Sequence, residues 1–147
     1  MGIAEYSIFI HAVPEVVWRI YADPSRIPQW QTGSPSIEDI NGGPGEPGAS
    51  YVSKRGPLSA RTTVIESDPP RRLLTKTDAY LGLRFDVESR LVPSADGTHL
   101  ILRAETWWPR SLRLVGQVIE LAILSSREAT KELRNLKTLI EQKAGTA

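Results

Sequence analysis

One predicted strand carries the side chains best suited to binding or acid–base chemistry. Tyr51, Ser53 and Arg55 occupy alternate positions of the segment 50–55, so they share one face of that strand. If this face points inward, Tyr51 offers a hydroxyl and Arg55 a fixed cation to a carbonyl or carboxylate on an otherwise apolar ligand. If it points outward, the same residues form an ordinary solvated edge. Alternation alone leaves both interpretations open.

The remaining polar residues give no support for a metal or cofactor site. His11 and His99 are the only imidazoles, and alternation places both on the polar side of strands. The chain has no cysteine and no His-x-x-x-His spacing, so we expect neither a metal nor a cofactor. The acidic side chains of the strand region are expected on solvated faces and turns rather than in a catalytic pair. They are Glu66, Asp68, Asp86, Glu88 and Glu105.

Three aromatic residues are further candidates for ligand contact. Trp30 closes a pair of short predicted helices, where it either packs in the core or borders a cavity. Trp107 and Trp108 are adjacent at a strand end and must point in opposite directions, and alternation selects Trp108 as the inward one. Tyr80 lies in a predicted hairpin, where it either caps a pocket or lies on the surface.

The order of secondary structure follows from residue patterns and turn signals. A β-branched and aromatic run over 4–11 favours a strand, and apolar spacing predicts short helices over 13–21 and 25–30. Gly- and Pro-rich turns divide 36–107 into six strands, which short connections make antiparallel. A single apolar stripe predicts one long helix over 111–143.

The inner face of the sheet can be assigned where alternation is unbroken. The apolar face of the sheet needs cover, and the long helix is the only element large enough to provide it. Because a strongly curved sheet cannot contact the helix along its whole length, a space between them is the candidate binding site. The inward residues expected there are Thr77, Phe85, Val87, Ser89, Leu102, Ala104 and Thr106, with Val115, Ile119 and Ala122 from the helix.

Length and charge narrow the classes of partner. The 147 residues, 40% hydrophobic and 24% charged, predict one domain over 1–147 with a real core. A net charge of +1 gives no general attraction to nucleic acid or to an anionic membrane. No basic leader precedes an apolar stretch, and none reaches the ~20 residues of a membrane span. We therefore expect a cytoplasmic protein with neither a nucleic acid partner nor stable membrane insertion.

Several short motifs resemble the START/Bet v 1-like (SRPBCC) superfamily and its bacterial polyketide cyclase/dehydrase branch. Residues 7–18, SIFIHAVPEVVW, and 23–30, DPSRIPQW, are similar to the opening of that branch, with Val13 inserted between Ala and Pro. The resemblance implies an α+β helix-grip fold. In that fold a seven-stranded, curved antiparallel sheet surrounds a long C-terminal helix, and two short helices follow the first strand. Further similar motifs are PGA at 47–49, DPPRRL at 68–73 and DGT at 96–98.

The same resemblance implies a cavity for a hydrophobic ligand and leaves the reaction open. One hypothesis is a binding module that encloses a lipid, polyketide or isoprenoid between the sheet and the C-terminal helix. The alternative is a polyketide cyclase or aromatase, in which the cavity directs enolisation and dehydration. In that case the weak catalytic candidates are Arg55 as oxyanion or carboxylate anchor and Tyr51 or Tyr80 as proton donor.

The first half of the predicted long helix has more apolar surface than one sheet face can cover. This excess either lines the cavity mouth or is buried against a twofold partner, so the protein is expected to be a monomer or a homodimer. The residues concerned are Leu114, Val118, Leu121, Ile123 and Leu124.

Overall fold

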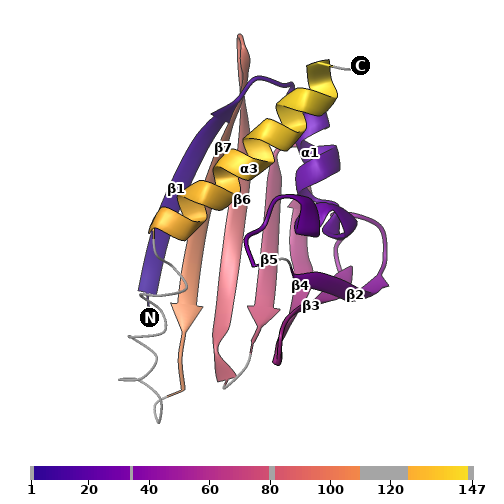
Figure 1. The fold of residues 1–147 in the computed structure, drawn as a ribbon, viewed down its shortest axis with the longest axis vertical. Coiled ribbons are helices and arrows are strands. Elements are labelled where there is room, and N and C mark those ends of the chain that lie inside the picture. The colour runs from indigo at the N-terminus through magenta and orange to yellow at the C-terminus, as the bar shows by residue number, and fades with distance from the viewer. Residues whose placement is uncertain (1, 34, 80–81, 110–125, 146–147) are drawn as a thin grey trace.

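A computed structural model describes residues 2–33, 35–79, 82–109 and 126–145 of the chain. Across these residues, seven strands form one antiparallel sheet in the order β1-β7-β6-β5-β4-β3-β2 (Figure 1). The strands are β1 (Gly2–Ile10), β2 (Ser36–Asn41), β3 (Ser50–Arg55), β4 (Leu58–Asp68), β5 (Arg72–Asp78), β6 (Arg84–Ser94) and β7 (Gly97–Trp107).

Two short helices follow β1. Helix α1 (Pro14–Tyr21) begins with Pro at its first turn, where the missing N–H costs no hydrogen bond. The next element, η1 (Pro24–Gln29), is capped by the Asp23 side chain, which accepts a hydrogen bond from the Ser25 N–H at 3.0 Å. This element is a 3-10 helix rather than an α-helix, since the ring of Pro28 inside it would clash with the carbonyl four residues earlier in an α-helix.

The C-terminal helix packs across the concave side of the sheet. Helix α3 (Ser126–Gly145) runs obliquely over β1, β7 and β6 (Figure 1). Lys137 Nζ donates to the Phe9 carbonyl at 2.8 Å and so ties α3 to β1. The sheet, the short helices and this helix confirm the expected α+β helix-grip fold. The first part of the predicted long helix, with its apolar excess, lies outside the described residues.

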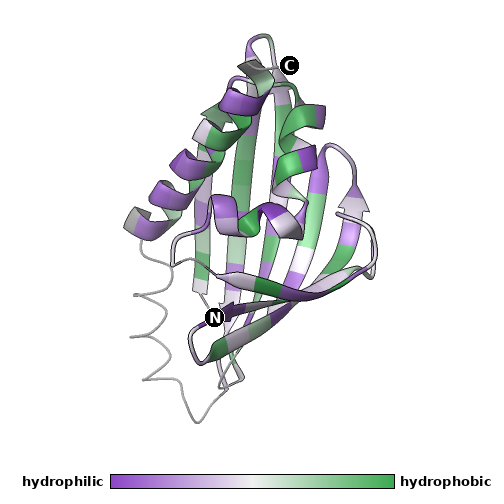
Figure 2. Ribbon diagram, turned by 45° about the vertical axis from the view of Figure 1, so that its right-hand side comes forward, coloured by the Kyte–Doolittle hydropathy of each residue, from purple (hydrophilic) through white to green (hydrophobic). Residues whose placement is uncertain are grey.

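The strand pairing confirms the inner face that alternation predicted for β5, β6 and β7. Phe85 lies opposite Thr77 on one side and Thr106 on the other. The next inward residue of β6, Val87, is likewise flanked by Thr75 and Ala104. Figure 2 shows that the apolar residues of the helices turn toward this face, while the polar side of α3 turns away from it.

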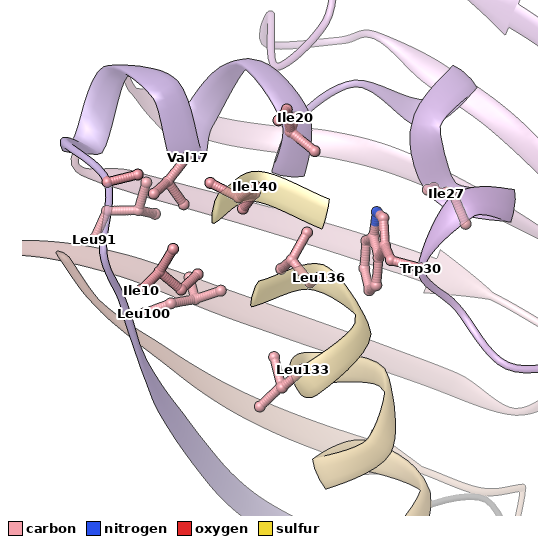
Figure 3. Packing of buried hydrophobic residues seen from close by; sticks show 11 residues of the cluster. Ile10, Val17, Ile20, Ile27, Trp30, Leu91, Leu100, Leu133, Leu136 and Ile140 are labelled. Carbon is pink, nitrogen blue, oxygen red and sulfur yellow. The ribbon is translucent and has the colours of Figure 1, made fainter. Parts of the chain in front are cut away.

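A hydrophobic core fills the end of the sheet formed by the β6–β7 hairpin. Leu136 and Ile140 of α3 are fully buried there, against Ile10 and Leu100 of the sheet and Val17 of α1 (Figure 3). This core holds α1 and α3 on the sheet. The same cluster extends along the concave face to Ile27, Trp30 and Leu133 (Figure 3).

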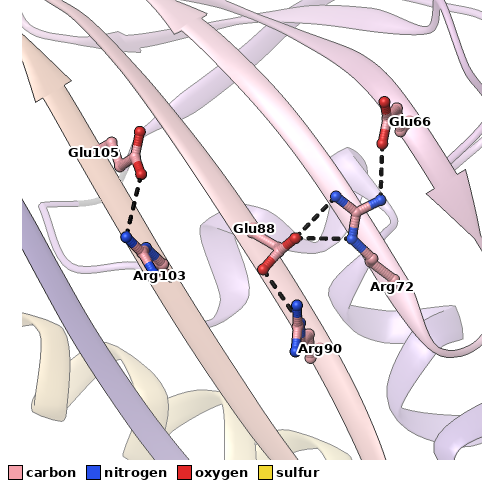
Figure 4. A network of polar contacts seen from close by, with 6 residues as sticks. All are labelled: Glu66, Arg72, Glu88, Arg90, Arg103 and Glu105. Atoms are coloured by element: carbon pink, nitrogen blue, oxygen red, sulfur yellow. Dashed lines mark hydrogen bonds and ion pairs between the residues drawn. The ribbon is translucent and has the colours of Figure 1, made fainter.

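The outer face of the sheet carries charged side chains in alternating pairs. Arg72 contacts both Glu66 and Glu88 at 2.8 Å, and Arg90 contacts Glu88 at 3.2 Å (Figure 4). The Arg72 hydrogen bond lowers the pKa of the Glu88 carboxyl. These acids pair with arginines and not with one another, as expected for solvated strand faces.

The short strand β2 forms one edge of the sheet and is irregular. Its pairing with β3 shifts register between Glu38 and Asn41, and Asp39 adopts a positive φ of 51°. The two acidic residues are paired with basic residues: Glu38 with Lys54 at 3.0 Å and Asp39 with Arg61 at 2.6 Å. The edge is therefore short, kinked and charged.

Within the described part of the chain, no helix has both the length and the apolar character needed to cross a bilayer. The same residues contain no group of three or more histidine, aspartate or glutamate side chains that could hold a metal ion.

Candidate functional site

A cavity of about 510 Å³ lies on the concave face beside the hydrophobic core, with which it shares Ile27, Trp30 and Leu133. Strands β3 to β6 form most of its wall, and β7 contributes Leu102. Helix α1, η1 and the residues after η1 close one side, and α3 closes another with Ala129, Glu132 and Leu133. The cavity is therefore bounded by segments that are far apart in the sequence.

The inner face of β3 is the one that carries the polar candidates. Tyr51, Ser53 and Arg55 all line the cavity. Their pairing with β4 sets this orientation, because Tyr51 lies opposite Thr62 and Ser53 opposite Ala60, which also line the wall. The structure thus places the face whose direction alternation left open on the inside of the sheet.

Seven of the residues predicted to contact a ligand are at this cavity. Their contact with a ligand stays a prediction, but their placement around one space agrees with it. They are Trp30, Tyr51, Arg55, Thr77, Phe85, Val87 and Leu102. Four other predicted contacts lie outside the described residues, namely Tyr80, Val115, Ile119 and Ala122.

Three inward residues of the central strands do not line this cavity. Ser89 is at the core end of β6, where its hydroxyl lies 2.6 Å from that of Tyr21. Ala104 is buried between Val87 and Ala4 of the neighbouring strands. Thr106 is at the β1 side, where its hydroxyl contacts the Gly2 carbonyl at 3.3 Å. Inward orientation is therefore not enough to place a residue at the cavity.

The two adjacent tryptophans differ from the expectation in one respect. Trp107 is on the outer face, as predicted, with the Arg84 guanidinium 5.1 Å from its ring centroid. Trp108 does not line the cavity, and its buried Nε1 has no hydrogen-bond partner among the described residues. Because β7 ends at Trp107, strand alternation does not extend to Trp108, and its contact with a ligand stays a prediction.

A polar cluster joins three elements at the Arg55 end of the cavity. Arg55 donates from Nη2 to the Gln31 side-chain oxygen at 3.0 Å and lies 3.6 Å from a Glu132 oxygen. Thr32 donates its hydroxyl to the same Glu132 carboxylate at 2.9 Å. The Arg55 side chain is 43% exposed, so this end of the cavity is in contact with solvent. Its cation is partly neutralised by the neighbouring carboxylate.

Hydroxyl groups mark the opposite part of the β3–β5 wall. Thr62 and Thr77 are buried, and their hydroxyl oxygens are 2.8 Å apart. Burial raises the pKa of the Tyr51 phenol, while a hydrogen bond with Thr62 opposes that rise. Tyr51 therefore stays protonated at neutral pH and can donate a hydrogen bond.

Several cavity residues were not found from the sequence. Those of β4 precede the register shift between Val64 and Glu66, and they were missed because alternation alone does not show which face of this strand points inward. Those of the helices were missed because helical spacing shows which face is apolar but not which strand it meets. A detectable signal existed only in β4, where Ala60, Thr62 and Val64 alternate. Missed residues include Tyr21, Ile27, Gln31, Thr62, Val64 and Leu133.

Tyr21 joins the cavity wall to the core and should make stability depend on alkaline pH. Its ring stacks on Trp30 with centroids 5.9 Å apart. Burial raises its pKa to about 12 from the ordinary tyrosine value of 10.0, although the hydrogen bond with Ser89 opposes the shift. Between these two pH values the unfolded chain loses the Tyr21 proton and the folded protein keeps it. The free energy of unfolding should therefore fall there by about 1.4 kcal/mol per pH unit.

Urea unfolding from pH 9 upward measures this slope, with Tyr21→Phe as the comparison. The variant loses the hydrogen bond to Ser89 and is expected to be less stable at every pH, so only the slopes are compared. Tyr51, whose pKa is also raised, is present in both proteins, and its charge is the smallest of the causes that act on the pKa of Tyr21. Equal slopes in the two proteins would show that Tyr21 titrates alike in the folded and unfolded chains.

An antiparallel sheet that holds a C-terminal helix over an apolar cavity defines the helix-grip class of α+β proteins. Within that class, the chain belongs to the family described as polyketide cyclase/dehydrase and lipid transport, whose model matches residues 1–141. A search among curated proteins returns no match.

Solved structures share the fold at low sequence identity. A protein from Rhodobacter sphaeroides is 20% identical, with a TM-score of 0.71, and the alignment covers 94% of this chain and 91% of that one. DynU16, from the dynemicin biosynthetic locus, is 23% identical with a TM-score of 0.69, covering 96% of this chain and 48% of that one. The Aha1 dimer from Colwellia psychrerythraea is 16% identical with a TM-score of 0.64, covering 96% and 97%. These likenesses establish the fold alone.

Proposed function

We propose that the protein binds a small hydrophobic molecule, of lipid, polyketide or isoprenoid type, in the cavity between the sheet and α3. The observation that carries this proposal is the cavity itself, whose volume of about 510 Å³ lies among described residues that are mostly apolar. Ligand pockets for small molecules typically measure roughly 300–1,000 Å³ and combine apolar walls with a few polar groups. Family membership supports the same class of ligand.

Arg55 is the residue proposed to meet a polar end of the ligand. Its guanidinium has five N–H donors, and the contacts with Gln31 and Glu132 both involve Nη2. The other donors can bind a ligand carbonyl or carboxylate at the solvent-exposed end of the cavity. Because Glu132 already offsets part of the positive charge, we expect a modest preference for anions rather than a requirement for them.

Fluorescence of N-phenyl-1-naphthylamine tests both parts of this proposal. The wild-type protein should bind this neutral probe saturably, and dodecanol and dodecanoate should displace it. Arg55→Gln should lower the affinity for dodecanoate by about two- to fivefold relative to the affinity for dodecanol, which is the range for a partly exposed ion pair. Arg61→Gln is the matched control, because Arg61 pairs with Asp39 on the outer face. An absence of saturable probe binding would refute the cavity as a ligand site.

A second candidate function is a polyketide cyclase or aromatase acting on a ligand held in this cavity. The observation that favours it is the presence of Tyr51 and Arg55 on the same wall. Arg55 would stabilise the enolate oxygen that forms when water at the solvent-exposed end takes the α-proton, and the Tyr51 phenol would donate its proton to a carbonyl or to the leaving hydroxyl, which departs as water, and regain a proton from solvent. Loss of water from a poly-ketone thioester in the presence of the protein would distinguish this function from binding alone.

Three further sequence predictions stand beside these functions as proposals. They are a single domain over 1–147, a cytoplasmic location, and a monomer or homodimer as the assembled state. Light scattering over a dilution series decides the last of them.

A further inference from the structure

The inner face of the sheet contains a transverse row of three hydroxyl groups. Tyr51 of β3 lies opposite Thr62 of β4, which lies opposite Thr77 of β5. All three line the cavity. Thr62 and Thr77 are only 7% and 5% exposed, so their hydroxyls are shielded from bulk water. We call these three residues the hydroxyl row.

The hydroxyl row has one more hydrogen than its internal bonds can use. The Thr62 and Thr77 hydroxyls are hydrogen-bonded at 2.8 Å, and Tyr51 is the next residue across the sheet from Thr62. Three hydroxyls bring three hydrogens; the bond between the threonines uses one, and a bond between Tyr51 and Thr62 can use at most one more, whichever way each bond points. Among the described residues, the row has no other side-chain partner that could accept the third. A buried donor without an acceptor is costly, so the row is poised to donate to a ligand atom in the cavity.

The surroundings of the hydroxyl row indicate which part of a ligand would carry the atom that accepts this hydrogen bond. Tyr51 and Arg55 are four residues apart on one strand, which separates their backbones by roughly 13 Å. The oxygen bound by the row is therefore distinct from a polar end at Arg55. Beyond Thr77, the next residue across the sheet is Phe85, whose ring provides an apolar flat surface beside the hydroxyls.

We propose that the hydroxyl row is a subsite for an oxygen acceptor, carbonyl or hydroxyl, on the body of a neutral hydrophobic ligand. This proposal rests on the proposed function and narrows its ligand class from plain hydrocarbon chains to oxygenated molecules. When hydroxyl groups are joined in a series by hydrogen bonds, each bond polarises the next O–H group. The terminal hydroxyl is therefore a better donor than an isolated one. A ligand that lacks the oxygen leaves that donor buried without an acceptor.

The test compares 9-fluorenone, 9-fluorenol and fluorene, which share one tricyclic skeleton. Each is titrated as a competitor of N-phenyl-1-naphthylamine, against the wild-type protein and against Tyr51→Phe, Thr62→Val and Thr77→Val. The preference for 9-fluorenone over fluorene should fall about fivefold in each variant, the scale of one net hydrogen bond. Comparing this ratio between proteins cancels the difference in water solubility between the competitors.

Two designs separate the hydroxyl row from general effects on the cavity. Thr63→Val makes the same substitution one residue along β4, at a position that does not line the cavity, and it should leave the ratio unchanged. The double variant Thr62→Val/Thr77→Val should lose no more preference than its stronger single parent, since the three groups act as one unit. The carbonyl stretching frequency of bound 9-fluorenone should rise in the variants as its hydrogen bond is lost.

The possible outcomes distinguish the subsite from the cavity. If the preference over fluorene falls in the variants for both 9-fluorenone and 9-fluorenol, the subsite accepts either oxygen. If it falls for 9-fluorenone alone, the subsite is specific for a carbonyl. If fluorene and the probe bind but no variant changes the ratio or the carbonyl frequency, the subsite is wrong while the proposed function stands. If no probe or competitor binds, both are wrong.

Discussion

Replacing Val87 by tryptophan is expected to abolish the uptake of hydrophobic probes while leaving the protein folded. Val87 lies in the middle of the cavity wall, flanked by Thr75 and Ala104 on the neighbouring strands. An indole at this position points into the same space that a ligand would occupy. The affinity for N-phenyl-1-naphthylamine should fall by more than about tenfold, corresponding to a loss above roughly 1.4 kcal/mol.

Val92→Trp is the matched control for this substitution. Val92 lies on the same strand but is 43% exposed, so the new indole can extend into solvent. Its probe affinity should equal that of the wild-type protein. Urea unfolding of both variants checks the fold, and the extra volume at Val87 should cost no more than about 1–3 kcal/mol. Unchanged probe binding by Val87→Trp would place the ligand somewhere other than this cavity.

Truncation of Leu136 to alanine should produce the largest loss of stability among single changes in α3. The Leu136 side chain is fully buried in the core that fixes α3 on the sheet (Figure 3). Removing it loses the burial of its methyl groups and leaves a cavity, which typically costs 2–5 kcal/mol, or about 3 kcal/mol here. That is a large share of a usual total of roughly 5–15 kcal/mol.

Urea denaturation followed by circular dichroism measures this loss. Leu58→Ala provides the comparison, because Leu58 is 43% exposed at the cavity rim and should lose less than about 1 kcal/mol. Equal losses at the two leucines would mean that Leu136 does not dock α3 against the sheet. Probe affinity in Leu136→Ala should be measured at low urea, where the folded population still dominates.

The fold was predictable because local signals and long-range structure agree over most of the chain. Gly- and Pro-rich turns separate the strands, and unbroken alternation in β5, β6 and β7 identifies their inner face. The predicted and the observed structure differ where the local backbone geometry changes. Pro28 makes η1 a 3-10 helix, and alternation cannot orient Trp108 because the strand has ended.

The candidate site was only partly predictable, since a residue pattern orients a side chain without naming its neighbours across space. Alternation placed Tyr51 and Arg55 on one face but could not say whether that face was inside. Gln31 and Glu132 belong to a loop and a distant helix, and only the folded chain brings them to Arg55. The pairing of Thr62 with Thr77 likewise depends on strand register, which the turns determine only approximately.

The irregular edge strand β2 has a consequence for a protein with an apolar cavity behind its sheet edge. A sheet edge offers unpaired N–H and C=O groups, and a flat apolar edge can recruit strands from other molecules into fibrillar aggregates. Here the kink at Asp39 and the charges of Glu38 and Asp39 interrupt that template. Motions that open the neighbouring cavity can therefore expose its apolar wall briefly without a straight edge beside it on which intermolecular β-structure could grow.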